Sequence, residues 1–245
     1  MSEVAVVRDA AEVAAAAAEI FIEATAGAVA ARGRGSVALT GGGTAKPLFE
    51  TVRRAPVRDK IPWEALQFFF TDDRAVPPDH LESNYGIAKR ELFDHVPVQE
   101  GQVHRLRGEA RDLDGEARRA AADLASTVGK PPRLDLVLLG LGPDGHLGSL
   151  FAGVPSSAER GEDELVRHVA APTRVEPHLE RLTLTPFLLV TARNVVLQVT
   201  GEKKAPVLAR ALEAEEDLVA CPAQWLRRAA GRVVIVADEA AASAL

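Results

Sequence analysis

The chain has 245 residues, of which 47% are hydrophobic and 26% charged, and its formal net charge is -6. This length suits one large α/β domain or two small ones, with enough apolar residues for a sizeable core. The acidic balance, without a basic stripe, argues against nucleic acid as a partner. The one cysteine, Cys221, rules out an internal disulfide and a cysteine-based metal site.

The N-terminal stretch 9–32 is apolar enough to suggest a signal peptide or a membrane segment. Glu12, Glu19 and Glu23, however, fall on one face of an α-helix. The first residues are also acidic rather than basic, unlike those of a signal peptide. We therefore expect an amphipathic helix in a cytoplasmic protein that has no membrane partner.

Short β-rich runs alternate with helical patterns along the rest of the chain. Strands are expected at 37–40, 66–71, 134–140, 194–200 and 232–237, and helices at 9–32, 44–54, 83–94, 111–128, 202–213 and 238–244. The alternation predicts an α/β fold of three layers, a mostly parallel sheet with helices on both faces. We expect a single domain over 1–245, in which the irregular segment 152–180 is a candidate lid or insertion.

Ligands of such sheets bind beyond the carboxyl ends of the strands. The first strong strand is followed by Gly41, Gly42, Gly43 and Thr44, which then open a helix. Glycine lets the backbone approach a ligand, and a helix N-terminus favours an anion, so this loop is a candidate phosphate site. The alternative is a plain turn with Thr44 as the helix N-cap; the spacing of a Walker loop is absent.

Asp72, Asp73 and Arg74 follow the second strand. They could supply a base, an orienting carboxylate and a phosphate clamp. Equally, the two acids could make turn hydrogen bonds and pair with Arg74 at the surface. Ser83 or Asn84 is expected to cap the helix that follows.

The segment 140–151, after the third strand, has the Gly-x-Gly-x-x-Gly spacing of a dinucleotide-binding turn. Its other residues argue against a nucleotide, because Pro143 lacks a backbone donor and Asp144 would lie beside a pyrophosphate. The glycines could instead bring Asp144 and His146 together, with Asp144 orienting the imidazole and His146 acting as a general base. In the plainer alternative, Asp144 caps a following helix and His146 is solvated.

Other candidate residues carry a weaker signal. Lys203 and Lys204 open a helix after the fourth strand and could complete a phosphate site, although such pairs are common on solvated helices. Arg181 lies at a potential strand start. The six histidines lack the spacing of a metal site, and no Gly-x-Ser-x-Gly elbow of a serine hydrolase is present.

Five ordered blocks resemble the 6-phosphogluconolactonase family over nearly the whole chain. They are "LTGGGTAKPLFE", "FFFTDDRAVPPDHLESNYGIAKREL", "DLVLLGLGPDGHLGSLFAG", "ERLTLTPFLLVTARNVVLQVTGEKKAPVLARAL" and "CPAQWLRRAAGRVVIVADEAAASAL". The family shares its superfamily and its Gly-x-x-Asp-Gly-His block with glucosamine-6-phosphate deaminase, so the resemblance also implies a Rossmann-like fold similar to that enzyme.

The sequence after His146 separates the two enzymes. A deaminase continues toward an Asn-Glu-Pro segment, whereas "LGSLFAG" looks like the lactonase, keeping its Ser149, Leu150 and Phe151. The chain departs from the lactonase pattern at Leu147, Gly148 and Ala152, at Asp73 in place of the usual Glu, and at "VEPHLE" in place of Lys-Pro-Pro. The last change concerns lid contacts more than chemistry.

The resemblance implies a site and a reaction. His146 would activate water and Asp144 would orient His146, with no cofactor and no metal. The residues implied to lie around the sugar phosphate, with Asp72 and Arg181 close by, are Gly42, Gly43, Thr44, Arg74 and Lys204. The implied reaction is hydrolysis of 6-phospho-D-glucono-1,5-lactone to 6-phospho-D-gluconate in the pentose phosphate pathway.

Two rival functions remain open from the sequence. One is a deaminase or isomerase of aminosugar phosphates, and the other is a non-catalytic sugar-phosphate sensor. Such sensors normally carry a DNA-binding helix-turn-helix, for which this chain has no basic segment. The resemblance to the lactonase family implies that the partner is a small phosphosugar lactone, and we expect it to be bound by a monomer.

Overall fold

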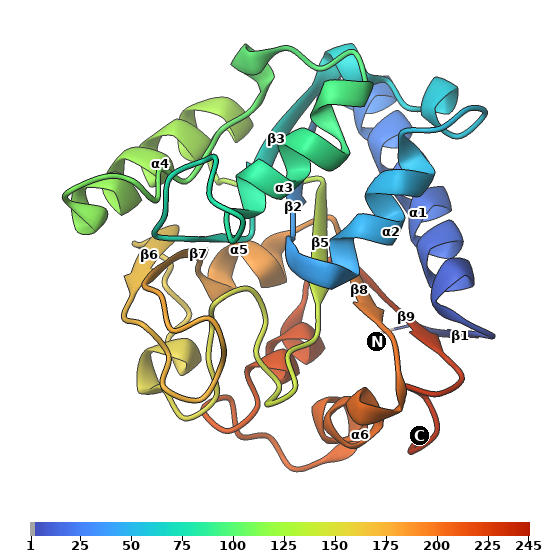
Figure 1. Ribbon diagram of the computed structural model, residues 1–245, viewed down its shortest axis with the longest axis vertical. Coiled ribbons are helices and arrows are strands. Elements are labelled where there is room, and N and C mark those ends of the chain that lie inside the picture. Colours follow the sequence, from blue (N-terminus) through green and yellow to red (C-terminus); the bar gives the residue numbers. More distant parts are fainter. Residues whose placement is uncertain (1–2) are drawn as a thin grey trace.

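A six-stranded parallel sheet forms the centre of the protein, for which the computed structural model describes residues 3–245 (Figure 1). The sheet order is β1-β9-β8-β5-β2-β3, and every neighbouring pair is parallel. The strands are β1 (Glu3–Val7), β2 (Gly35–Leu39), β3 (Leu66–Phe70), β5 (Leu136–Gly140), β8 (Asn194–Val199) and β9 (Arg232–Asp238). Every strand except β1 was expected from its run of consecutive apolar residues. The structure buries these runs, as the central strands of a parallel sheet require.

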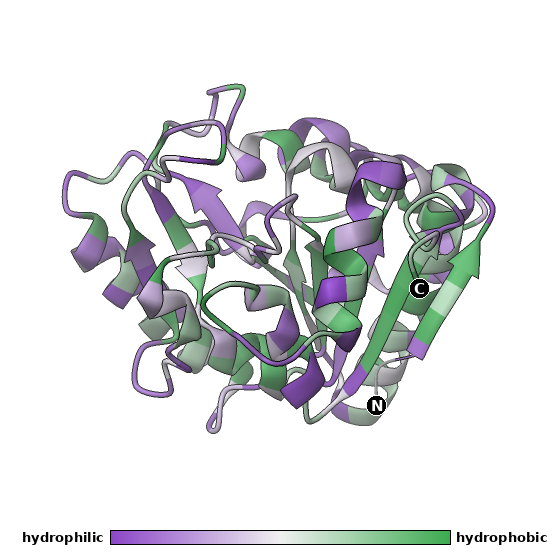
Figure 2. Ribbon diagram, turned by 90° about the horizontal axis from the view of Figure 1, so that it is seen from below, coloured by the Kyte–Doolittle hydropathy of each residue, from purple (hydrophilic) through white to green (hydrophobic). Residues whose placement is uncertain are grey.

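Helices cover both faces of this sheet, which confirms the predicted α/β class. They are α1 (Ala10–Arg32), α2 (Gly42–Val52), α3 (Asn84–Glu91), α4 (Leu113–Val128), α5 (Pro186–Thr191) and α6 (Ala205–Glu213). The connections through α1 and α2 run along the sheet toward β3, whereas those through α5 and α6 run back toward β1. Because parallel crossovers are right-handed, the first two helices lie on one face of the sheet and the last two on the other. In Figure 2 the strands of the parallel sheet are mostly hydrophobic, whereas the helices beside them carry both hydrophobic and hydrophilic residues.

The expected N-terminal helix is α1. Asp9 caps its start by accepting the backbone N–H groups of Ala11 and Glu12, and Gly33 ends it in the left-handed conformation. By length and composition alone α1 could span a membrane. Its apolar side chains, such as Phe21, are instead buried in the protein core.

A second, antiparallel sheet was not expected. Its order is β4-β7-β6, formed by β4 (Asp72–Arg74), β7 (Arg181–Leu184) and β6 (Val166–Val169). The segment 72–74 is therefore a short strand and not a loop, since its backbone pairs with β7. The segment 152–180 contains β6 and a short 3-10 helix at Pro155–Ala158; its role as a lid or insertion stays a prediction.

Two helix predictions need correction. The helix expected at 238–244 is absent: β9 runs to Asp238, and the few residues after it form turns, too few to propagate a helix. The helix expected from residue 44 starts at Gly42, with Gly41 as its N-cap, so Thr44 lies within the first turn and is not the cap.

The order of the strands in the sheet indicates where a ligand should bind. From β2 the chain moves to β3 on one side, and β5 lies on the other side of β2. Ligands of open α/β sheets bind at such a switch point, beyond the carboxyl ends of the strands. The loops after β2 and β5, which carry the glycines 41–43 and the segment 141–146, therefore meet at the position where a ligand is expected.

Candidate active site

The loop after β2 presents the N-terminus of α2. Gly42 has a φ of 71°, in the left-handed region that favours glycine. The first turn of α2 has no acidic side chain, so its free N–H groups face no competing carboxylate. Thr44 packs against Gly140 at the end of β5, where an added Cβ would lie 3.1 Å from the Thr44 hydroxyl oxygen. The structure thus brings Thr44, in the first turn of α2, to the end of β5.

The segment after β5 wraps the backbone around one histidine. No helix follows Asp144; the residues from 141 to 150 form turns and short bridges. The His146 ring lies over Gly142, where an added Cβ would come within 2.0 Å of the imidazole Nδ1. Gly145 has a φ of 97°. Gly142 of the nucleotide-like spacing therefore makes room for the His146 ring, and Asp144 is not the cap of a helix.

Asp144 holds the imidazole in one orientation. Its Oδ1 lies 2.6 Å from His146 Nδ1 and also accepts the His146 backbone N–H at 3.2 Å. Burial alone would raise the pKa of Asp144, but the hydrogen bond and the charge attraction from His146 outweigh it and lower the pKa to about 2. Asp144 is therefore ionised near neutral pH. Within residues 3–245, no group hydrogen-bonds to His146 Nε2, which is left for a ligand or water.

Two basic residues hold the backbone of this turn from outside. Lys204 Nζ donates to the carbonyl oxygen of Leu141 at 2.7 Å, and Arg210 donates to the carbonyl oxygen of Asp144. Burial lowers the pKa of the Lys204 amine, an effect that the negative charge of Asp144 opposes. Lys204 thus lies beside the turn, as expected, whereas Arg210 carried no signal in the sequence.

Arg74 and Arg181 belong to the neighbouring antiparallel sheet. Arg74 Nη1 donates to the Glu82 carbonyl at 2.8 Å and to Asn84 Oδ1 at 2.6 Å, and its Nε is buried without a hydrogen-bond partner. Arg181 donates to the carbonyls of Leu179 and Pro177. The two guanidinium groups lie close enough for Arg74 to lower the pKa of Arg181, and a nearby anion would offset this repulsion.

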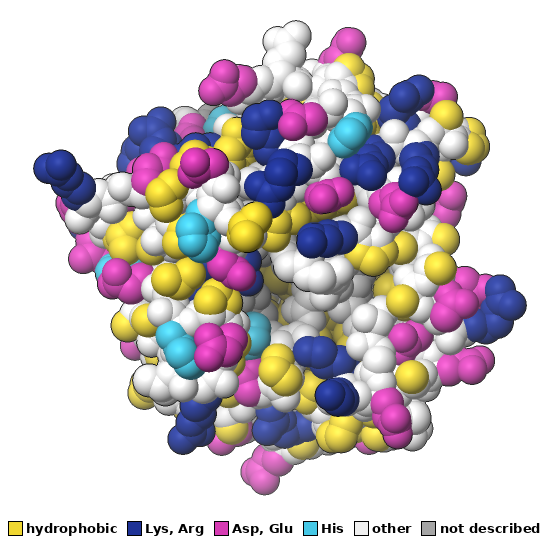
Figure 3. Space-filling model, viewed as in Figure 1, with side chains coloured by type: hydrophobic (Ala, Val, Ile, Leu, Met, Phe, Trp, Pro, Cys, Tyr) yellow, Lys and Arg dark blue, Asp and Glu magenta, His cyan; other side chains and the backbone are white. Residues whose placement is uncertain are grey.

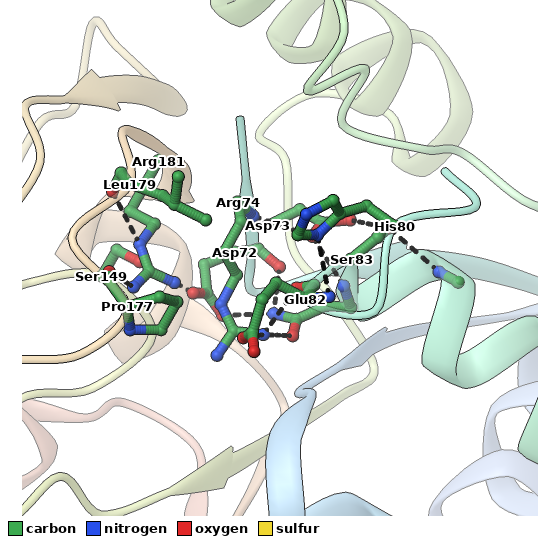
Figure 4. A network of polar contacts seen from close by, with 12 residues as sticks. Asp72, Asp73, Arg74, His80, Glu82, Ser83, Ser149, Pro177, Leu179 and Arg181 are labelled. Atoms are coloured by element: carbon green, nitrogen blue, oxygen red, sulfur yellow. Dashed lines mark hydrogen bonds and ion pairs between the residues drawn. The ribbon is translucent and has the colours of Figure 1, made fainter. Parts of the chain in front are cut away.

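Asp72 lies between the two arginines and is buried (Figure 4). Its Oδ2 accepts the Ser149 hydroxyl at 2.7 Å, so the carboxylate ties β4 to the segment that carries His146. Burial lowers the pKa of Arg181, and Arg74 lowers it further, whereas Asp72 raises it. Asp72 is thus close to the site, but it contacts protein groups.

Asp73 has a structural role at the start of α3. Its carboxylate accepts the backbone N–H groups of Arg74, Asn84 and Tyr85 and the hydroxyl of Ser83. Burial raises the pKa of Asp73 to about 6, against the effect of these hydrogen bonds. Ser83 caps α3, as one of the two expected caps. Over residues 3–245 the Arg74 guanidinium bonds the Glu82 carbonyl and Asn84 Oδ1 and forms no ion pair with either acid, so the surface pairing considered for this loop is wrong.

These elements surround one hollow. It opens at the centre of the face in Figure 3, where Figure 1 shows the start of α2 and the loop after β5, and Lys and Arg side chains lie around it. Over residues 3–245, no group of three or more His, Cys, Asp or Glu side chains has the arrangement of a metal site. A base, an orienting carboxylate and several cationic or N–H donors can bind an anion and move a proton.

Comparison with known proteins identifies the family of the chain. Residues 8–235 match the family described as glucosamine-6-phosphate isomerases/6-phosphogluconolactonase. A 6-phosphogluconolactonase of Synechocystis sp. is 35% identical over 204 residues, covering 82% of this chain and 80% of that protein. The structure of 6-phosphogluconolactonase from Trypanosoma brucei matches with a TM-score of 0.86 and 29% identity, covering 100% of this chain and 99% of that chain. A monomeric glucosamine-6-phosphate deaminase shares the fold, with a TM-score of 0.84 at 21% identity over 99% of this chain and 100% of that one.

Proposed function

The chain belongs to the family of glucosamine-6-phosphate isomerases and 6-phosphogluconolactonases, and we propose that it is a lactonase of the pentose phosphate pathway. It hydrolyses 6-phospho-D-glucono-1,5-lactone to 6-phospho-D-gluconate. The relatives named 6-phosphogluconolactonase support this activity. The observation that carries the mechanism is the 2.6 Å contact between Asp144 and His146, in a turn beside the N-terminus of α2.

His146 acts as the general base. Its Nε2 takes a proton from water as the water oxygen attacks the lactone carbonyl carbon. When the tetrahedral intermediate collapses, the bond from this carbon to the ring oxygen breaks, and the proton on Nε2 passes to that oxygen. Asp144 stabilises the imidazolium that exists between the two steps, because it is ionised and hydrogen-bonded to Nδ1.

The sugar phosphate binds at the other side of the site. The N–H groups of Gly42 and Gly43, the Thr44 hydroxyl and the Lys204 ammonium act as donors at the start of α2. Arg74, with its unpartnered Nε, adds a further cation. Arg181 lies over the face of the Phe151 ring, with its guanidinium carbon 5.9 Å from the ring centroid. It contributes positive charge to the phosphate site.

We propose that the enzyme acts as a monomer; every residue assigned to the site belongs to the same chain. Its compartment is the cytoplasm, in agreement with a single, buried cysteine that needs no oxidising surroundings.

The experiment couples freshly generated lactone to 6-phosphogluconate dehydrogenase and measures the rate above buffer, because the lactone also hydrolyses spontaneously. Acceleration supports the lactonase. No acceleration, with ammonia released from glucosamine 6-phosphate, would show a deaminase. Tight phosphosugar binding without either reaction would show a sensor.

A further inference from the structure

Asn84 is the first residue of α3 and is 2% exposed, and it joins three parts of the site. Its Oδ1 accepts a hydrogen bond from Arg74 Nη1 at 2.6 Å. Its Nδ2 donates to the backbone oxygen of Asp72 at 2.9 Å and to Asp72 Oδ1 at 3.2 Å. The amide therefore holds Arg74 from one side and Asp72 from the other.

The same amide packs against the loop after β2. A Cβ added at Gly41 would lie 1.9 Å from Asn84 Oδ1 and 2.2 Å from the amide carbon. Only glycine leaves room for this contact, although Gly41 has an ordinary φ of -116°. The amide thus fixes Arg74 relative to the N-terminus of α2, where the other phosphate donors lie.

The start of α3 does not depend on the Asn84 side chain. Ser83 caps the helix by accepting the backbone N–H of Gly86 at 3.0 Å. Asn84 attaches to Asp73 through its own backbone N–H, at 2.7 Å, which any residue at this position retains. The buried amide is therefore available for another task.

We propose that Asn84 is a positioning residue for lactone hydrolysis. It holds the Arg74 guanidinium in the direction of the substrate phosphate, while its own Nδ2 is anchored on the backbone oxygen of Asp72. A misplacement of about 1 Å in such a shell can cost about 100-fold in rate. The inference rests on the proposed function, in which Arg74 binds the substrate.

The test is a double-mutant cycle of Asn84→Ala and Arg74→Ala, with kcat and KM for the phosphorylated lactone measured above buffer. Asn84→Ala should lower kcat/KM by about 10- to 100-fold in the wild-type background. In the Arg74→Ala background the same change should cost less than about 3-fold, because residues that act as one unit are not additive. A merely structural role would give the same loss in both backgrounds.

Two further variants guard against misfolding. Gly41→Ala keeps every hydrogen-bonding group of Asn84 but displaces its amide, and should lower kcat/KM in the same direction. Asn194→Ala removes the chain's other asparagine, whose Nδ2 donates to the Asp135 backbone oxygen at the opposite end of the sheet. It should leave kcat/KM unchanged.

The outcomes separate the inference from the function on which it rests. If Arg74→Ala impairs the enzyme and Asn84→Ala does not, or if their effects are additive, only the inference is overturned. If Arg74→Ala itself leaves kcat/KM unchanged, the substrate role of Arg74 fails and the inference falls with it. If the wild type has no lactonase activity, the proposed function fails first.

Discussion

Arg74 and Arg181 lie directly opposite each other in the antiparallel pair of β4 and β7. Like charges in this arrangement destabilise a sheet. Asp72 offsets part of the repulsion, but the buried Nε of Arg74 has no hydrogen-bond partner. The pair thus concentrates positive charge in a protein whose net charge is -6, as binding of an anionic metabolite requires.

Arg74→Ala should mainly raise KM, by about 10- to 100-fold, because a charged hydrogen bond to phosphate contributes about 1.5–3 kcal/mol in ground and transition states alike. Steady-state kinetics on the phosphorylated lactone measure the effect. Arg118→Ala, on the exposed face of α4, is the matched control and should change neither constant. A pure loss of kcat would move Arg74 to the reacting atoms.

Gly142→Ala should lower kcat by about 100-fold, since its Cβ would meet the His146 ring and displace the base. Gly101→Ala places the same methyl group in open space and should be active. Kinetics of the two variants, with their melting temperatures, give the comparison. An active Gly142→Ala enzyme would show that this glycine does not seat His146.

Ser149→Ala should destabilise the fold by about 1–3 kcal/mol, because it removes a buried hydroxyl that donates to the Asp72 carboxylate. Urea unfolding gives the free energy of unfolding. Ser126→Ala, at an exposed position of α4, should stay within about 0.5 kcal/mol of the wild type. Equal values for the two variants would mean that the contact between Ser149 and Asp72 contributes nothing to stability.

The lowered pKa of Asp144 makes the stability of the protein depend on pH, with a definite sign. The pKa of Asp144 is about 2 in the folded protein and ordinarily 3.8, so the unfolded chain binds the proton more tightly. The stabilisation is complete above about pH 4 and is lost as the pH falls toward 2. The difference in unfolding free energy between wild type and Asp144→Asn should shrink over this range. A difference that is constant from pH 5 to pH 2 would contradict the shift.

The sequence predicted the parallel sheet because its signals are local. Each of β2, β3, β5, β8 and β9 is an apolar run that needs no partner to be recognised. The second sheet gave no such signal: β4 has only three residues, and Asp72 pairs with Thr183, more than a hundred positions away. A strand of this kind exists only through its tertiary partner.

In the candidate site, too, some residues can be recognised from local sequence and others only from the tertiary structure. His146, Asp144 and the glycines near them could be identified because they are adjacent in sequence and follow a strand. In the sequence Asn84 is a candidate helix cap, and Arg210 gives no signal. Their contacts with Arg74 and with the Asp144 backbone depend on how distant loops meet. The spacing of residues along the chain does not predict such contacts.

The most direct test of the account compares wild type, His146→Ala and buffer in the coupled lactone assay, with binding of 6-phosphogluconate measured alongside. The account predicts that only the wild type accelerates hydrolysis, by orders of magnitude over the variant, while both proteins bind the product with similar affinity. A His146→Ala enzyme that still hydrolyses the lactone at the wild-type rate would contradict the assignment of His146 as the base.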